Sequence, residues 1–256
     1  MADLLREPYR ALYQNYYGDG AVAIKRGMSA LDAAAHISAM VGTGSFTRVI
    51  DVGAGEGSLL QVLDDGHFAS ELYALEISST GVRAIEARHL RSLVEIRQFD
   101  GYQIPYPDRF FDLAILCHVL EHVEHERILL QELRRVARHV LIEVPIEHGL
   151  RIDRKIVSGV RFGHINFYLP DTLLNLLRTS GLRVIRSRLW YSSLAYEQHC
   201  AGRTRGLLKA ALRRSALKLS ARLAPWMFTY LFVAYCASDA ADAPPEPPPD
   251  KGAQPP

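Results

Sequence analysis

Short apolar runs rich in β-branched residues alternate along the chain with segments whose apolar residues recur at helical spacing. The apolar runs predict seven strands, at residues 48–52, 71–77, 93–99, 111–116, 140–144, 182–189 and 228–236. The segments between them predict helices, among them 58–63, 79–90, 127–135 and 170–180. This alternation predicts an α/β fold, with a mostly parallel seven-stranded sheet and helices on both faces.

Several segments depart from the alternation and suggest how the chain is organised. Residues 1–45 predict an N-terminal helical cap in front of a domain that spans 46–238. We expect a polar loop at 147–168 and a basic helical insertion at about 198–224, before the last strand. The last strand is expected to lie antiparallel at the edge of the sheet. The tail, 239–256, is rich in proline and is expected to be disordered.

The composition is that of an ordinary folded protein, because 48% of the residues are hydrophobic and 23% are charged. The three cysteines are far apart, which disfavours a disulfide framework and a zinc site and favours a reducing compartment. The first residues lack the pattern of a signal peptide, and the apolar stretch 226–237 is shorter than the ~20 residues that span a bilayer. We therefore expect a cytoplasmic protein without a transmembrane segment.

Positive charge is gathered in one segment near the C-terminus. The net charge is +2, yet residues 198–238 contain seven lysines and arginines and no acid. Within 203–223, four leucines lie close to one helical face between these charges: Leu208, Leu212, Leu219 and Leu223. Three interpretations remain open, namely a solvated helix on the domain, a lid or partner surface over a ligand pocket, and peripheral contact with a membrane. The first two are favoured, because no strongly aromatic face accompanies the leucines.

The stretch VIDVGAGEGSLL, residues 49–60, follows a strand and precedes a helix. Glycines at this point let a ligand approach the backbone at the carboxyl end of a sheet. The spacing G-x-G-x-G differs from the G-x-G-x-x-G of dinucleotide sites, and the lysine of a P-loop does not follow. Asp51 and Glu56 would repel a pyrophosphate and suit a cationic ligand. These features argue against the alternative enzyme class, an NAD(P)-dependent oxidoreductase.

Acids also end the next two predicted strands. Glu76 ends the second strand, where a nucleoside offers its ribose hydroxyls, and Asp100 ends the third, where an adenine offers its amino group. With Asp51 they suit a ligand that has an ammonium group, a ribose and an adenine. The alternative is that these carboxylates only cap turns.

Several stretches, in this order, resemble the class I S-adenosylmethionine-dependent methyltransferases: VIDVGAGEGSLL, LYALEIS, IRQFDGYQIPYPDRFFDLAILCHVLEHV, LRRVARHVLIEVP and GHINFYLPDTLLNLLRTSGLRV. The resemblance covers residues 48–185 and is closest to the small-molecule branch that includes ubiquinone-biosynthesis-like enzymes. It implies a Rossmann-like fold, methyl transfer as the reaction and S-adenosyl-L-methionine as the cofactor.

The resemblance also implies which residues of this chain bind the cofactor. The implied set is Asp51 and Gly53 by the methionine moiety, Ala54 and Gly55 lining the pocket, Glu76 at the ribose, Asp100 and Gly101 at the adenine, Ile77 on the adenine ring, and Cys117 and His118 bordering the cofactor and the methyl acceptor.

Methyl transfer is an in-line displacement, so a base is needed only if the acceptor must lose a proton. His118, just after the fourth strand, is the first candidate for that base, and packing against the cofactor is its alternative role. His164 is the second candidate, with Tyr168 four positions later; its alternative role is to anchor the loop by a hydrogen bond. Glu147 and His148, just past the fifth strand, are further candidates for binding the acceptor.

The stretch HVLEHVEHER, residues 118–127, contains three histidines at near-helical spacing. It lacks the H-E-x-x-H arrangement of zinc-dependent hydrolases. We therefore interpret it as the polar start of a helix, and the sequence predicts no metal site.

Together these features predict a methyltransferase that acts on oxygen or nitrogen of a small-molecule metabolite in a biosynthetic pathway. Residues 117–120 read CHVL where DNA adenine methyltransferases have an N-P-P-Y type signature, so nucleic acid is not an expected substrate. The non-enzymatic alternative is a methyltransferase-like binding module that acts through the basic segment.

Overall fold

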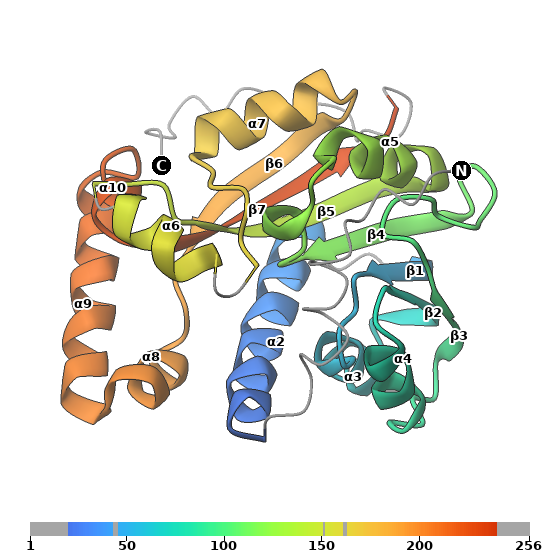
Figure 1. Ribbon diagram of the computed structural model, residues 1–256, viewed down its shortest axis with the longest axis horizontal. Coiled ribbons are helices and arrows are strands. Elements are labelled where there is room, and N and C mark those ends of the chain that lie inside the picture. Colours follow the sequence, from blue (N-terminus) through green and yellow to red (C-terminus); the bar gives the residue numbers. More distant parts are fainter. Residues whose placement is uncertain (1–19, 43–45, 151, 161–162, 240–256) are drawn as a thin grey trace.

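The computed structural model of the 256-residue chain describes residues 20–42, 46–150, 152–160 and 163–239. Expectations that concern residues 1–19 and 240–256, which are part of the predicted cap and nearly all of the predicted tail, lie outside these ranges. The described residues form one twisted sheet with helices packed above and below it (Figure 1).

The sheet contains the seven predicted strands. They are β1 (Phe46–Val52), β2 (Ala69–Glu76), β3 (Leu93–Gln98), β4 (Phe111–Cys117), β5 (Ala137–Ile146), β6 (Arg183–Trp190) and β7 (Tyr230–Ala237). Their order is β3-β2-β1-β4-β5-β7-β6. The first five pair in parallel, whereas β7 is antiparallel to both β5 and β6. The predicted mostly parallel sheet is confirmed.

The expectation that the last strand forms an edge was wrong, because β7 lies between β5 and β6. Most side chains of β7 are buried on both faces of the sheet. An edge strand with so little polar character would invite pairing with another chain. The edge is taken instead by β6, in which Arg183, Arg186 and Arg188 alternate with or flank apolar residues.

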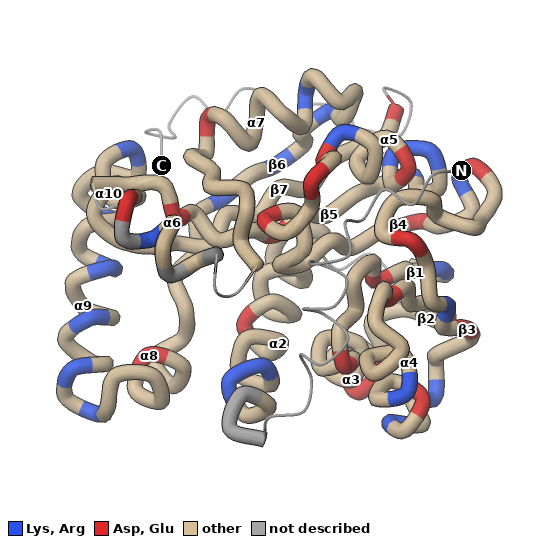
Figure 2. Tube along the Cα trace, in the orientation of Figure 1, with Lys and Arg blue, Asp and Glu red and all other residues tan. Residues whose placement is uncertain are grey.

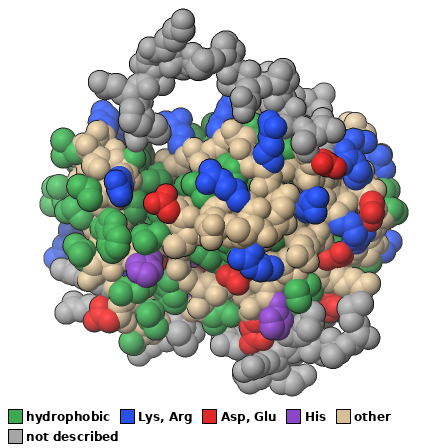
Figure 3. Space-filling model, turned by 90° about the horizontal axis from the view of Figure 1, so that it is seen from above, with side chains coloured by type: hydrophobic (Ala, Val, Ile, Leu, Met, Phe, Trp, Pro, Cys, Tyr) green, Lys and Arg blue, Asp and Glu red, His purple; other side chains and the backbone are tan. Residues whose placement is uncertain are grey.

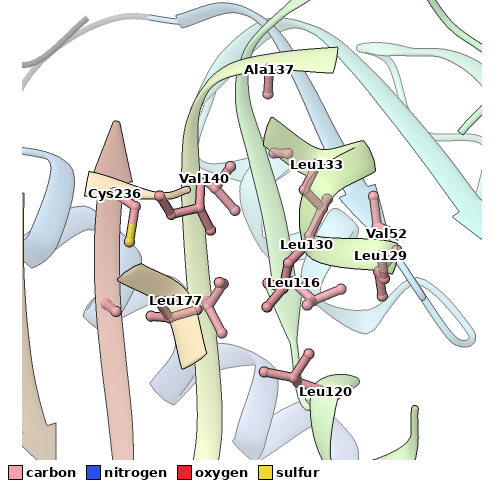
Figure 4. Packing of buried hydrophobic residues seen from close by; sticks show 14 of the residues in the cluster. Val52, Leu116, Leu120, Leu129, Leu130, Leu133, Ala137, Val140, Leu177 and Cys236 are labelled. Carbon is pink, nitrogen blue, oxygen red and sulfur yellow. The ribbon is translucent and has the colours of Figure 1, made fainter. Parts of the chain in front are cut away.

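Two layers of helices cover the sheet. On one face lie α5 (Glu126–Val136) and α7 (Pro170–Thr179), and on the other α2 (Gly20–Val41), α3 (Ser58–Asp65) and α4 (Ser79–Glu86). Successive residues of β1 serve the two layers in turn, since Ile50 and Val52 pack in the cluster with α5 and Val49 in the cluster with α2. Figure 4 shows the first cluster, where Leu130 and Leu133 of α5 face the sheet.

Further elements lie at the carboxyl ends of the parallel strands. A short 3-10 helix, η1 (Leu120–His122), follows β4, and three helices follow β6: α8 (Leu194–Ala201), α9 (Arg203–Leu219) and α10 (Ala224–Met227). The helical insertion therefore begins earlier than the predicted residue 198. None of the helices in the described ranges combines the length and apolar character that a membrane span requires.

The predicted polar loop at 147–168 is wrong in part, because it contains the helix α6 (Ile152–Val160). The sequence carries a weak signal for it, since apolar residues recur four positions apart at 152, 156 and 160. Figure 1 places α6 beside α10. The two segments are joined where the Leu150 backbone N–H donates to the Trp226 carbonyl at 3.0 Å.

Asp64, at the end of α3, fastens that helix to the segment before β3. Its carboxylate accepts hydrogen bonds from the backbone N–H groups of Arg91 (3.0 Å) and Ser92 (2.8 Å) and from the Ser92 hydroxyl. Asp64→Ala leaves these donors without their acceptor, so we expect a loss of about 2 kcal/mol in the free energy of unfolding. Denaturant titration measures it.

The neighbouring Asp65 provides the matched control. It is exposed and accepts one hydrogen bond, from the Gln61 side chain at 3.1 Å. Asp65→Ala should change the free energy of unfolding by less than about 0.5 kcal/mol. Equal effects of the two substitutions would show that the Asp64 contacts do not stabilise the fold.

Candidate functional site

A cavity of about 670 Å³ lies at the carboxyl ends of the parallel strands. Its glycine end is lined by Asp51, residues 53–56, Glu76, Ile77, Phe99, Gly101 and Tyr102. Its histidine end is lined by His118, Glu121, His122, Glu147 and His164, together with residues of α8 and α9. Helix α2 contributes Lys25, Arg26, Ser29, Ala30 and Ala33. A cavity of this volume is typical of a site for small molecules.

The glycine loop between β1 and α3 forms the floor of the glycine end. Gly53, Gly55 and Gly57 have φ angles of +77°, +60° and +79°, in the left-handed region that favours glycine. A Cβ atom on Gly53 would lie 2.5 Å from Cγ2 of Val119. The backbone N–H of Gly53 donates to the Leu75 carbonyl at 2.8 Å, which holds the loop against β2. The loop therefore leaves its backbone open to a ligand.

Two carboxylates are buried beneath this loop. Asp51, in β1, is 3% exposed, and Glu76, at the end of β2, is 2% exposed. Glu76 accepts hydrogen bonds from the backbone N–H groups of Gly55 and Ser78, both at 2.9 Å. Burial raises the pKa of each carboxyl to about 7, and the charge of Glu76 contributes to the rise at Asp51. A ligand that brings positive charge or hydroxyl donors would stabilise the ionised forms.

Gly81, in the first turn of α4, packs against two residues of the glycine end without lining the cavity itself, and the sequence analysis missed it. A Cβ atom there would lie 2.6 Å from the Gly55 carbonyl oxygen and 2.7 Å from Cγ of Glu76. The turn is set by Ser78, whose hydroxyl accepts from the N–H groups of Thr80 and Gly81. The only sequence signal for this contact was a glycine in the first turn of the helix that directly follows β2, the strand that ends at Glu76.

Glu56 has a different role from the one that its sequence position suggested. Its carboxylate lies 2.7 Å from Nε of Arg26 on α2, and it accepts a hydrogen bond from the Ser58 hydroxyl, also at 2.7 Å. Its negative charge is therefore balanced by the protein. The acidic character of the glycine end comes from Asp51 and Glu76, while Glu56 ties α2 to the glycine loop.

The loop after β3 holds the predicted adenine partner, Asp100. One of its carboxylate oxygens accepts from the backbone N–H groups of Tyr102 (2.9 Å) and Gln103 (2.7 Å), which makes the turn. Asp100 itself does not line the cavity, whereas its neighbours Phe99 and Gly101 do, as does Ile77 just after β2. The surface at this point is thus mainly backbone and apolar side chains, which suits the face of a flat ring.

His118 stands where the glycine end meets the histidine end, in the left-handed region with φ +55°. Its Nδ1 lies 3.4 Å from the Glu121 carboxylate and its Nε2 lies 3.3 Å from that of Glu143. Burial opposes protonation, but these two carboxylates outweigh it and raise the pKa of His118 to about 10. An imidazole that is already protonated binds and positions better than it accepts a proton.

Glu143, in the middle of β5, joins His118 to helix α2. Its other oxygen lies 2.8 Å from Nδ1 of His36, whose ring stacks on Trp190 with centroids 4.5 Å apart. The Cys117 thiol donates to Glu143 at 3.8 Å. Burial alone would raise the pKa of Glu143, yet its contacts with His118 and His36 hold it well below its usual range. A glutamate inside an otherwise apolar strand was the signal that could have revealed this network.

The structure brings His164 and Glu147 together across the cavity wall. Nδ1 of His164 lies 2.7 Å from the Glu147 carboxylate, and the His164 ring stands perpendicular to that of His122, with centroids 4.8 Å apart. The proposed acceptor-binding residues His148 and Tyr168 lie elsewhere. The Tyr168 hydroxyl donates to Glu126 at 2.7 Å, and the His148 ring contacts that of Trp226, so neither lines the cavity.

The basic helix α9 lines part of the histidine end with its inner face. Lys209 and Arg213 line the cavity and pair with the fully buried Glu197 of α8. Figure 2 shows lysines and arginines along α9 and no acidic residue on it. Its leucines point the other way, since Leu208, Leu212 and Leu219 are all exposed. In Figure 3, hydrophobic side chains gather on the side of the molecule where α9 and α10 lie.

The comparisons with known proteins identify the family. A family profile described as a methyltransferase domain matches residues 24–187, more than half of the chain. The chain therefore belongs to this family and is a class I S-adenosylmethionine-dependent methyltransferase. A search of curated proteins gave no match to its sequence.

Solved structures share the fold at low sequence identity. A methyltransferase from Thermotoga maritima is 10% identical, with a TM-score of 0.60 over 90% of this chain and 99% of that chain. The geranyl diphosphate C-methyltransferase of Streptomyces coelicolor A3(2), solved with Mg²⁺, geranyl diphosphate and S-adenosyl-L-homocysteine, is 12% identical, with a TM-score of 0.60 over 81% and 79%. The cyclase SpnF is 18% identical, with a TM-score of 0.57 over 80% and 79%.

Gly81→Ala tests whether the close approach of α4 to the glycine loop matters. The added Cβ would meet the Gly55 carbonyl and Glu76, so we expect S-adenosylhomocysteine to bind at least about tenfold more weakly by calorimetry. Gly27→Ala on α2 is the matched control, because its Cβ would have no atom within 4 Å. Unchanged binding by Gly81→Ala would contradict this assignment.

Proposed function

We propose that the protein transfers a methyl group from S-adenosylmethionine to oxygen or nitrogen of a small-molecule metabolite in a biosynthetic pathway. The observation that carries the proposal is one continuous cavity with two chemically different ends. The glycine end offers buried carboxylates beneath an open loop. The histidine end offers imidazoles and carboxylates that can hold a polar acceptor.

The glycine end fits the cofactor that the family uses. Asp51 would face the methionine moiety beside residues 53–55, and Glu76 would accept hydrogen bonds from the ribose hydroxyls. Ile77 and Phe99 supply apolar surface for the adenine. When bound, S-adenosylmethionine supplies an electrophilic methyl group on a positively charged sulfur. Buried carboxylates without a cationic partner of their own favour such a ligand over a pyrophosphate.

The histidine end supports a polar acceptor of small size. His118, Glu121 and His164 provide hydrogen-bonding groups on the wall that adjoins the glycine end. Residues of helices α8 and α9 line the opposite side, which limits the space for the acceptor. A polymer such as nucleic acid would need an open groove.

The polar wall also favours oxygen or nitrogen over carbon as the methylated atom. Acceptors with hydroxyl or amino groups can form hydrogen bonds with His118, Glu147 and His164, whereas a hydrocarbon acceptor would shield these polar groups from water without adding a hydrogen bond to their existing contacts. The shared fold alone does not decide which atom is methylated, since the structural neighbours include a C-methyltransferase and a cyclase.

Glu76→Gln tests the cofactor site. The amide keeps the size of the side chain but loses the charge and part of its acceptor capacity, so we expect S-adenosylhomocysteine to bind about 10- to 100-fold more weakly. Glu86→Gln, on the exposed side of α4, is the matched control and should bind as the wild type does. Calorimetry measures both, and NAD binding in place of S-adenosylhomocysteine would overturn the assignment.

Transfer itself is measured with S-adenosylmethionine carrying a labelled methyl group and a panel of small hydroxyl and amino compounds. We expect label in at least one compound, together with release of S-adenosylhomocysteine. Tight cofactor binding with no transfer across the panel would support the non-catalytic binding module instead.

The raised pKa values of Asp51 and Glu76, about 7 each, predict a pH dependence of cofactor binding. A cationic ligand stabilises the ionised carboxylates, so affinity should rise as the pH increases from 6 to 8, by about tenfold for each carboxylate that ionises. The carboxyls should release protons on binding at pH 7, which calorimetry in two buffers of different ionisation enthalpy detects. A flat profile would contradict the proposed contacts.

A further inference from the structure

Three potential metal ligands meet at the histidine end, although they are far apart in the sequence. Glu121 and His122 belong to η1, and His164 lies in the loop before α7. One ligand atom from each lies within 4.8 Å of the others, and all three residues line the cavity. Ligand atoms that each lie about 2.1 Å from a shared cation are about 3 Å from one another. Small side-chain shifts would therefore bring these three ligand atoms to the spacing that a bound cation requires.

The loop that carries His164 is held against η1 by the backbone. The N–H groups of Ile165 and Asn166 donate to the Glu121 carbonyl, at 2.8 Å and 3.0 Å. The Asn166 amide donates to the carbonyls of Leu120 (3.1 Å) and Val123 (2.7 Å). These bonds fix the two segments next to each other, so the grouping of the three side chains is built into the fold.

Glu121 gives an independent sign that a ligand belongs here. Its side chain is 1% exposed, and its Oε1 lies 3.4 Å from Nδ1 of His118. Its Oε2 is buried and has no hydrogen-bond partner among the described residues. An unpartnered carboxylate oxygen in a buried setting costs free energy unless a cation or a donor binds to it.

Both histidines are arranged as metal-binding histidines usually are. Nδ1 of His122 lies 3.0 Å from the Gly163 carbonyl, which can only accept, so this nitrogen carries the proton. Nδ1 of His164 lies 2.7 Å from the Glu147 carboxylate. Nε2 of His122 lies 4.0 Å from Oε1 of Glu121, a separation that a shared cation could bridge. The carbonyl or carboxylate behind each ring orients it and makes it a better ligand.

We propose that Glu121, His122 and His164 bind one divalent transition-metal cation, with Glu147 as a positioning residue behind His164. Two imidazoles and one carboxylate suit Mn²⁺, Fe²⁺, Co²⁺ or Zn²⁺ better than Mg²⁺ or Ca²⁺. Three protein ligands leave coordination positions for a ligand from the cavity. A hydroxyl oxygen of the methyl acceptor fits them, and this part of the inference rests on the proposed function.

The proposal departs from our expectation that residues 118–127 bind no metal. A second group, Cys117, His118 and Glu143, also has its ligand atoms within 4.8 Å of one another. Its members pair with one another, and Glu143 also pairs with His36. That group has its charges satisfied and is not part of the proposed site.

Cobalt binding to the full-length protein tests the site directly. The protein is stripped by dialysis against a chelator, freed of chelator and titrated with Co²⁺, which is followed by visible absorption and by calorimetry. We expect one cation per chain. His122→Ala and His164→Ala should each weaken binding at least about 100-fold, and Glu147→Gln about tenfold. His125→Ala, an exposed histidine of the same stretch, should bind as the wild type does.

The outcomes separate the inference from the proposed function. Thermal unfolding of each variant verifies that it is folded. If an alanine variant does not fold, the conservative Glu147→Gln variant still tests the site. No stoichiometric cobalt binding, or equal affinity in all variants, overturns the metal site. S-adenosylhomocysteine binding, measured on His164→Ala, should be unchanged. If the wild-type protein does not bind S-adenosylhomocysteine, the proposed function is overturned, whereas the cobalt result still stands.

Discussion

The burial of two carboxylates, Asp51 and Glu76, at the ends of adjacent parallel strands is the constraint on which the rest of the site depends. Their pKa values near 7 mean that the protein alone satisfies their charge only in part. The backbone of Gly55 reaches Glu76 only because the glycine loop adopts left-handed conformations and because Gly81 has no side chain. The sheet therefore holds a buried acidic site, which suits the cationic nucleoside that we propose as its ligand.

The sheet and the glycine end could be predicted because their signals are local. Strands of a parallel sheet that is covered on both faces are short apolar runs, and each run matched a strand within a few residues. Since parallel strands end at the same edge, Asp51 and Glu76 had to lie near each other. The glycine spacing favours a cationic ligand over a phosphate without any knowledge of tertiary contacts, and this assignment remains a prediction.

The histidine end could not be predicted in the same way, because its contacts join segments far apart in the chain. His36 belongs to an apolar helix whose pattern does not reveal that one polar residue meets Glu143. His164 reaches Glu121 only because backbone hydrogen bonds fasten its loop to η1. The spacing of histidines within one stretch could not reveal the group that we propose as a metal site, since its third member, His164, comes from another part of the fold.

A crystal structure of the full chain with S-adenosylhomocysteine tests the central claim most directly, namely that the buried carboxylates select the cofactor and orient it toward the histidine end. The account predicts ribose hydroxyls on the Glu76 carboxylate, the amino group of the homocysteine part beside Asp51, and the sulfur facing His118. A ligand bound away from both carboxylates, or turned so that its adenine lies against His118, would contradict it.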